Sequence, residues 1–144
     1  MSPAKEKRRK EAKALLEGFW GKAFNFKNPK PLKIGINEDL VKSAEAQGLP
    51  FDEVVIKRAL SAYVYTLRYT YVLTREKKRY DLEGQIVGEV TEEERQEAKE
   101  SIKRYHDRLE EKTRNRAIEA ENQAKAKSRK IARENAVNGN KLSE

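Results

Sequence analysis

The 144-residue chain contains no cysteine, one tryptophan, one methionine and one histidine. Without cysteine it can form no disulfide, thiolate nucleophile or cysteine-ligated zinc site. The single histidine, His106, lies in a charged segment without neighbouring ligand residues, which predicts a surface position rather than a metal ligand or a catalytic base. We therefore expect no metal and no cofactor.

Long hydrophobic runs and enzyme signatures are also missing. No stretch approaches the about 18 consecutive apolar residues of a membrane span, and the basic first residues are not followed by the apolar run of a signal peptide. There is no phosphate-binding glycine loop, dinucleotide fingerprint, H-E-x-x-H motif or nucleophile elbow. These absences predict a soluble cytoplasmic protein that is not an enzyme and has no catalytic residues.

The charge is distributed unevenly along the chain. Residues 1–13 carry six bases and two acids, residues 112–144 carry nine bases and four acids, and residues 81–111 carry eleven acids and five bases. With 39% charged and 37% hydrophobic residues the full length is too polar to be packed. We expect a domain at 14–111, a basic arm at 1–13, and a basic tail at 112–144 that is partly helical or disordered.

The order of the expected elements predicts a mainly α fold with a small β-hairpin. Apolar spacing, prolines, glycines and capping residues define them. They are a helix at 4–20, an extended piece at 32–34, a helix at 36–47 capped by Asn37, a helix from Leu49-Pro50 past Tyr69, a hairpin at 79–90 turning at Glu83-Gly84, and a long helix opened by a capping box at 91–94.

The segment 57–79 combines positive charge with aromatic rings. It holds seven bases, one acid and four tyrosines. Helical spacing places Ile56, Leu60 and Tyr63 on one buried face, so Tyr63 is expected in the core. Bases interleaved with tyrosines suit a polyanion that also presents flat bases, and a near-neutral body with a basic face and two basic arms is typical of a nucleic-acid binder.

Several separated blocks occur in an order that resembles the ProQ/FinO family of bacterial RNA chaperones over roughly residues 12–110. The blocks are Pro31-Leu32-Lys33-Ile34-Gly35-Ile36, Asp39-Leu40, Arg58-Ala59-Leu60, Tyr63, Arg68-Tyr69, Tyr71, Arg79-Tyr80-Asp81-Leu82-Glu83-Gly84 and Gly88-Glu89-Val90-Thr91. The resemblance implies a compact ProQ/FinO-like domain with a concave basic face. It also implies that the protein binds the 3′ ends of structured RNAs, such as a terminator hairpin with a single-stranded tail. The process implied is post-transcriptional regulation by small or antisense RNAs.

Carried over by position, the resemblance implies an RNA-binding face. Its residues are Lys33, Gly35, Ile36, Asn37, Lys57, Arg58, Arg68, Tyr69 and Arg79. Arg58 and Arg79 are expected to contact phosphates, and Tyr69 to stack on an unpaired base or donate its hydroxyl to a terminal phosphate or ribose. The N–H groups from Gly35 onward are expected to cradle the last phosphate. Ser61 and Leu67 depart from some relatives, which carry a base and a tryptophan there.

Further contributors to RNA binding are expected beside this face, and all but Arg75 have a structural alternative. They are Tyr65, Tyr71, Arg75, Lys77 and Lys78. Tyr71 has the spacing of a core residue as well as of a ligand contact, Tyr65 could shield an element edge, and Lys77 and Lys78 could belong to a merely solvated turn.

Two other functions are compatible with the sequence. An architectural DNA-binding protein would use the basic helical arms to hold a duplex. A protein-interaction scaffold would pair the long C-terminal helix with a partner, but its apolar positions are too sparse for a heptad seam, so a monomer is expected. Structured RNA, including small RNAs, mRNA 3′ ends and antisense RNA, is the partner class that the first reading predicts, with no membrane partner.

Overall fold

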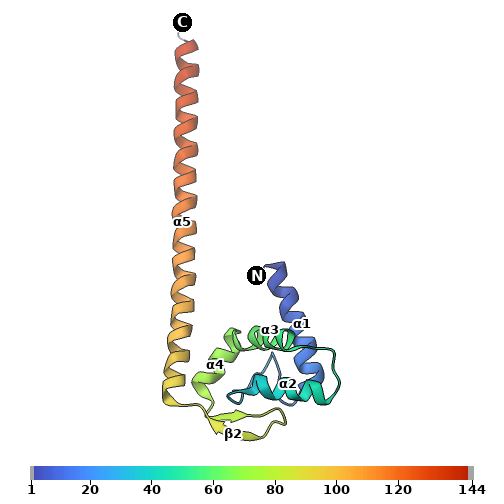
Figure 1. Ribbon diagram of the computed structural model, residues 1–144. Coiled ribbons are helices and arrows are strands. Elements are labelled where there is room, and N and C mark those ends of the chain that lie inside the picture. Colours follow the sequence, from blue (N-terminus) through green and yellow to red (C-terminus); the bar gives the residue numbers. More distant parts are fainter. Residues whose placement is uncertain (1, 143–144) are drawn as a thin grey trace. The chain divides into compact units, whose positions relative to one another are not determined.

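The computed structural model describes residues 2–142, and the side chains of residues 2–139 (Figure 1). Its elements are α1 (Pro3–Trp20), α2 (Ile36–Ala46), α3 (Glu53–Val64), α4 (Leu67–Arg75), β1 (Lys78–Tyr80), β2 (Ile86–Glu89) and α5 (Glu92–Leu142). The predicted mainly α fold with one small hairpin is confirmed. The chain forms two compact units that meet between Lys103 and Arg104, inside α5.

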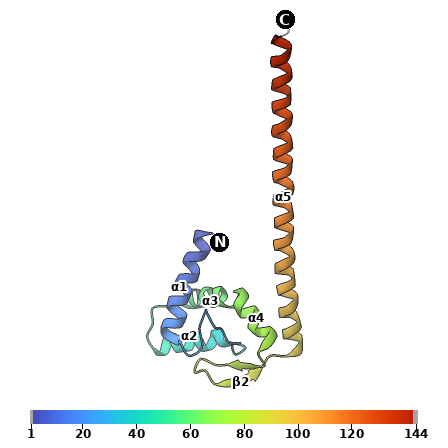
Figure 2. The ribbon, with the colours of Figure 1, turned by 180° about the vertical axis from the view of Figure 1, so that it is seen from behind.

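Helix α1 packs chiefly on α3 (Figure 2). Its buried stripe is Ala12, Leu16 and Trp20, three residues at intervals of four that lie on one face of a helix. The Trp20 indole Nε1–H donates to Ser43 Oγ at 2.9 Å, which ties α1 to α2. The expected boundary at residue 13 falls inside α1, and Ala12 already belongs to the core.

The expected helix from Leu49-Pro50 past Tyr69 is two helices. Asp52, not proline, opens α3, since its carboxylate accepts from the Val55 N–H at 2.9 Å. The break comes at Thr66, whose hydroxyl donates to the Tyr63 carbonyl at 2.8 Å and accepts from the Tyr69 N–H at 3.3 Å. Threonine competes for backbone partners and so ends one helix and caps the next. The expectation of a single helix that continues past Tyr69 is wrong for this reason.

Tyr63 lies in the core, as its spacing predicted. It is fully buried, and its ring makes edge-on contacts with Phe24 and Phe26 at centroid distances of 5.0 and 4.8 Å. The Tyr69 ring lies 5.6 Å away on the next helix. These aromatic contacts join the loop after α1 to the α3–α4 corner.

The hairpin forms where the sequence placed it. Strands β1 and β2 pair antiparallel, and Gly84 has a φ of 78°, a left-handed conformation that favours glycine. The extended piece at 32–34 joins the hairpin through one parallel bridge between Leu32 and Tyr80. The Tyr80 N–H donates to the Pro31 carbonyl at 2.9 Å, and the Lys33 N–H donates to the Tyr80 carbonyl at 2.8 Å.

Helix α2 begins two residues earlier than a cap at Asn37 requires. Gly35 is the N-cap, with a φ of 83°, and Asn37 lies inside the first turn, so the expected cap was wrong. No side chain caps this helix, because its N-cap residue is glycine. Gly48, with a φ of 65°, follows the end of the helix as predicted.

Helix α5 opens with the predicted capping box. The Thr91 N–H donates to Glu94 Oε1 at 3.0 Å, and the Glu94 N–H donates to Thr91 Oγ1 at 3.1 Å. The helix then runs to Leu142, so the described part of the expected tail is helical rather than disordered. Residues 112–138 contain no proline or glycine and many alanines, lysines, arginines and glutamates, which have high helix propensity.

Candidate nucleic-acid interface

The start of α2 leaves open space next to a backbone bend. A Cβ added to Gly35 would meet no atom within 4 Å, although the φ of 83° strains any other residue there. Two of the N–H groups there are engaged, because the Ile36 N–H donates to the Lys33 carbonyl at 3.3 Å and the Glu38 N–H donates to the Gly35 carbonyl at 3.2 Å. The N–H groups of Gly35 and Asn37 are the ones that can favour an anion at this helix start. The Ile36 side chain is buried, and Asn37 is half-buried.

Lys33 stands beside this helix start but is already paired. Its Nζ lies 2.7 Å from Asp39 Oδ2, and this hydrogen bond raises the pKa of the Lys33 ammonium above its ordinary value. The pair is partly exposed, and exposed pairs are worth little. A phosphate could therefore compete with Asp39 for this lysine.

Arg79 and Tyr69 hold the two backbone groups of Leu32. The Leu32 N–H donates to Tyr69 Oη at 3.1 Å, and Arg79 Nη1 donates to the Leu32 carbonyl at 2.7 Å. Arg79 Nη2 is paired with Glu94, while its Nε is buried without a hydrogen-bond partner among the described residues. Leu32 immediately precedes Lys33, so this network fixes the approach to α2.

This burial corrects two expected roles. Tyr69 is only 6% exposed and Arg79 only 8% exposed. A ring enclosed by the core cannot stack on a base, and a guanidinium with two nitrogens already engaged is not an open phosphate contact in this conformation. The helix break at Thr66 accounts for Tyr69, because it turns α4 so that this ring faces the core beside Tyr63. Arg79 is buried through its contacts with Leu32 and Glu94. Whether these residues affect RNA binding stays a prediction.

Burial also changes the acidity of the tyrosines. Desolvation raises the pKa of Tyr63 to about 12 and raises the pKa of Tyr69 above its ordinary value. Both hydroxyls therefore stay protonated at neutral pH and can act as hydrogen-bond donors as well as acceptors. Their hydrogen bonds serve the fold.

Glu94 couples this network to the start of α5. Its pKa is lowered, first by the hydrogen bond from the Thr91 backbone and further by Thr91 Oγ1 and Arg79. A carboxylate with a depressed folded pKa stabilises the fold above its unfolded value, and that contribution is lost as the pH falls through the folded pKa.

We predict that Glu94→Gln flattens the acid limb of the stability profile. The free energy of unfolding of the parent should fall from about pH 5 downward. One reason is that, near the ordinary pKa of 4.5, unfolded Glu94 takes up a proton that folded Glu94 does not yet bind, which favours the unfolded state. Urea unfolding at half-unit steps from pH 3 to 7 measures this. The gap between parent and variant should be largest near neutral pH and narrow on acidification, and a gap that is constant with pH contradicts the assignment.

The remaining predicted residues on α3 and α4 are exposed. Lys57 pairs with Glu53 at 2.7 Å, whereas Arg68 Nη1 donates to the Lys27 carbonyl at 3.3 Å. Arg58 is exposed at the side of α3 that faces α1, and Tyr65, just after α3, is 85% exposed.

The secondary candidates lie on α4 and the hairpin. Tyr71 is 37% exposed, which lies between a core and a surface position. Arg75 and Lys77 are exposed, and Lys78 pairs across the hairpin with Glu89 at 2.9 Å. This pair lowers the pKa of Glu89, and the hydrogen bond from Lys78 is the main cause of the lowering.

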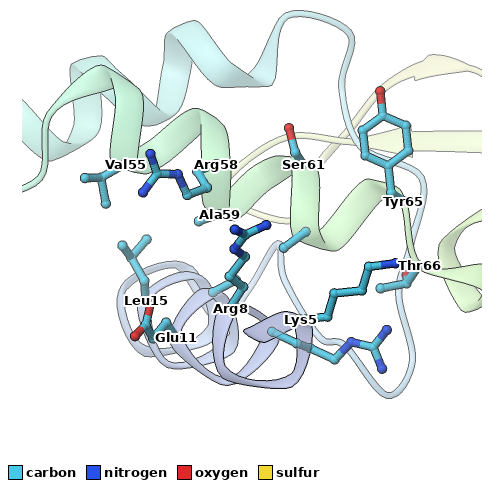
Figure 3. A pocket seen from close by; sticks show the side chains of 13 residues that line it. Lys5, Arg8, Glu11, Leu15, Val55, Arg58, Ala59, Ser61, Tyr65 and Thr66 are labelled. Carbon is cyan, nitrogen blue, oxygen red and sulfur yellow. The ribbon is translucent and has the colours of Figure 1, made fainter. Parts of the chain in front are cut away.

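A groove between α1 and α3 brings Arg58 and Tyr65 together with residues that the sequence analysis assigned only to a basic arm (Figure 3). It has a volume of about 570 Å³. The bases that line it from α1 are Lys5, Arg8 and Arg9. A signal for them existed in the sequence, since residues 5, 8, 9 and 12 lie on one helical face and residue 12 is apolar.

The described residues offer neither a metal-binding cluster nor a membrane-spanning helix. Among residues 2–139 no group of three histidine, aspartate or glutamate side chains could hold a metal ion. His106 is exposed, as predicted. None of the described helices is both long and apolar enough to cross a bilayer.

Comparison with known proteins identifies the family. The model of the ProQ/FINO family matches residues 6–138. The RNA chaperone ProQ of Idiomarina loihiensis is 35% identical over 111 residues, which cover 76% of this chain and 53% of that protein. The chain thus spans about half the length of this curated relative.

Two solved structures are similar as well. A FinO-like RNA chaperone from Neisseria meningitidis has 35% identity and a TM-score of 0.51, covering 68% of this chain and 75% of its own. A ProQ homolog from Legionella pneumophila has 31% identity and a TM-score of 0.54, covering 76% and 88%. The family match spans nearly the whole sequence, and the fold agrees with it, so the chain belongs to the ProQ/FinO family.

Proposed function

We propose that this protein is an RNA chaperone that binds the 3′ ends of structured RNAs. Its ligand is a terminator-type hairpin with a single-stranded tail, and it acts in regulation by small or antisense RNAs. The named relatives are RNA chaperones, which supports the class. The observation that carries the finer proposal is the rigid backbone from Leu32 to the start of α2.

The physical argument concerns where an RNA end can be held. Leu32 is clamped through both its N–H and its carbonyl, so the residues that follow are positioned without cost on binding. The bend at Gly35 leaves room for close approach, and the first-turn N–H groups attract a phosphate. Lys33 adds charge next to them. The phosphate that precedes a free 3′ hydroxyl fits such an edge better than one inside the chain, because only a single nucleoside has to be accommodated beyond it.

In this proposal Tyr69 and Arg79 are positioning residues. They act through Leu32 rather than by open contact. The exposed bases of α3 and α4, Lys57, Arg58 and Arg68, contact phosphates of the stem, which is recognised by shape and charge with little sequence reading. The basic residues of α5 add contacts to further phosphates, and the protein works as a cytoplasmic monomer.

The test compares one hairpin with three different ends. A hairpin with a uridine tail is prepared with a free 3′ hydroxyl, with a 3′ phosphate, and with the tail extended into a second stem. At one fixed salt concentration, fluorescence anisotropy should show about tenfold weaker binding for both altered ends, since one well-placed polar contact is worth roughly 1.4 kcal/mol.

Competition by duplex DNA is the control for this measurement. Duplex DNA of the same length should compete poorly, because it offers neither a tail nor 2′-hydroxyls. Equal affinity for all three RNA ends would reject the end-binding proposal, and efficient competition by the DNA would favour the architectural DNA-binding alternative.

A further inference from the structure

The bases of the groove between α1 and α3 have no ion pair, unlike four of the other basic candidates. Lys33, Lys57, Lys78 and Arg79 each have a carboxylate partner. Within residues 2–139 no ion pair involves the four groove bases, which are Lys5, Arg8, Arg9 and Arg58. The groove lining includes one acid, Glu11, which itself faces Lys7 at 4.0 Å. The groove therefore holds positive charge that the protein does not neutralise itself.

The four bases come from two helices and converge on one hollow. In Figure 3 the Arg8 side chain extends from α1 toward α3, and Lys5 runs along the groove toward Thr66. α1 is anchored to α3 by Ala12 and Leu16, so the spacing of the two basic rims is set by the core. Preorganised charges bind an anion with little ordering cost.

The groove has an apolar floor and an open aromatic ring at its end. The floor is built from the small residues Ala12, Ala59 and Ala62 with Leu15 and Val55 beside them. Tyr65 lies in the junction after α3, where 85% of it is accessible to solvent. Tyr65 is the C-cap residue of α3, but it caps through its backbone N–H, so this role does not require an exposed aromatic ring.

The ligand must combine negative charge with flat, partly apolar groups. Single-stranded RNA does so, because its phosphates can meet the arginines while a base stacks on the tyrosine. An acidic amphipathic helix would need a broad apolar contact, and the small, mostly buried alanines of the floor offer little. A duplex keeps its bases stacked inside and cannot use the ring. The observations favour the single strand.

We propose that the groove between α1 and α3 is a second RNA-binding site, which takes a short single-stranded segment away from the 3′ end. This inference rests on the proposed RNA-binding function and deepens it. A protein with one site for an RNA end and another for an unpaired strand can hold two segments that are to be paired.

The test uses a ten-nucleotide oligouridylate with a 3′ phosphate, which presents no free 3′ hydroxyl. Arg8→Ala/Arg9→Ala should weaken its binding about tenfold and reduce the slope of log affinity against log salt by about 1.4, the loss of two single-strand phosphate contacts. The matched control is Lys10→Ala/Lys13→Ala. It removes the same charge from exposed positions of the same helix outside the groove lining, and should change affinity by less than about threefold.

A second pair of variants tests the ring. Tyr65→Ala should weaken oligouridylate binding about tenfold, whereas Tyr65→Phe should bind like the parent, because stacking needs the ring and not the hydroxyl. Tyr65 is exposed, so neither change should lower the melting temperature appreciably.

Equal losses in the two α1 double variants would overturn the groove site and leave only diffuse charge. Unchanged binding of oligouridylate by Tyr65→Ala would overturn it too. If the groove takes an acidic peptide instead, all variants should bind RNA like the parent, and this result would also overturn the proposal.

The hairpin with three ends separates the two proposals. If the groove variants bind oligouridylate like the parent while the hairpin still needs its free end, the groove proposal fails and the proposed function stands. The opposite pattern rejects only end binding.

Discussion

Replacing Arg79 by methionine should lower the free energy of unfolding by about 3 kcal/mol. The change removes the bond to the Leu32 carbonyl and leaves the Glu94 carboxylate without its guanidinium in a partly buried position. Losing one partner of a buried pair typically costs 3–5 kcal/mol, and the partial exposure of Glu94 places the value at the lower end. Urea unfolding at pH 7 measures it.

The exposed pair of Lys57 and Glu53 offers a matched control. Lys57→Met removes a salt bridge of good geometry, 2.7 Å, from the surface of α3, and should cost less than about 0.5 kcal/mol. Equal losses for the two variants would contradict the buried role of Arg79. The double variant Arg79→Met/Glu94→Gln should recover part of the loss, because no unpaired carboxylate remains.

The same variant separates two roles for Arg79 in RNA binding. If Arg79 acts through Leu32, its removal should disorder the start of α2. The folded variant should then bind the free-ended hairpin more weakly and lose most of its preference over the 3′-phosphorylated end. Backbone amide exchange at residues 33–37 reports that disorder. Weakened binding with unchanged exchange would instead assign Arg79 to a direct phosphate contact that forms on binding.

Tyr63→Ala should be the most destabilising single change, with a loss of about 3–5 kcal/mol. The ring is fully buried and contacts Phe24, Phe26 and Tyr69, so truncation leaves a cavity at the α3–α4 corner. Such a loss is comparable to the whole stability of a small domain, and part of the population should be unfolded at 37 °C. Thermal unfolding followed by circular dichroism checks it.

Tyr63→Phe is the control for that prediction. The hydroxyl of Tyr63 makes only long hydrogen bonds to the backbone of Asn25, at 3.4 Å, so its removal should cost less than about 1 kcal/mol. A large effect of Tyr63→Phe would show that the hydroxyl, rather than ring packing, holds the loop after α1.

Local signals predicted most of the fold correctly. The α2 and α5 helices, the hairpin and the Thr91–Glu94 capping box follow from periodicity and from turn and cap residues, which act over a few positions. The α3–α4 break was missed because apolar spacing continues through it. Only the burial of Tyr63 and the two hydrogen bonds of Thr66 favour the corner.

The candidate site was less predictable than the fold. Exposed bases such as Arg58 and Arg68 were predicted from the charge pattern, but nothing local distinguishes an open arginine from one that holds Leu32 across 47 residues. The same holds for the α1 bases. Their helical face was readable, whereas their meeting with Arg58 depends on how α1 docks.

The amino-acid sequence by itself determined the class of this protein: a polar chain without cysteine, mainly helical, with positive charge at both ends and in one central stretch that also holds four of the six tyrosines. Periodicity and charge are properties of neighbouring residues and can be read directly. Only the tertiary structure decided which of those charges are open, because burial and pairing depend on residues far apart in the chain. It placed Tyr69 and Arg79 in the interior, where both bind the backbone of Leu32, and it placed Arg8 and Arg58 on one groove.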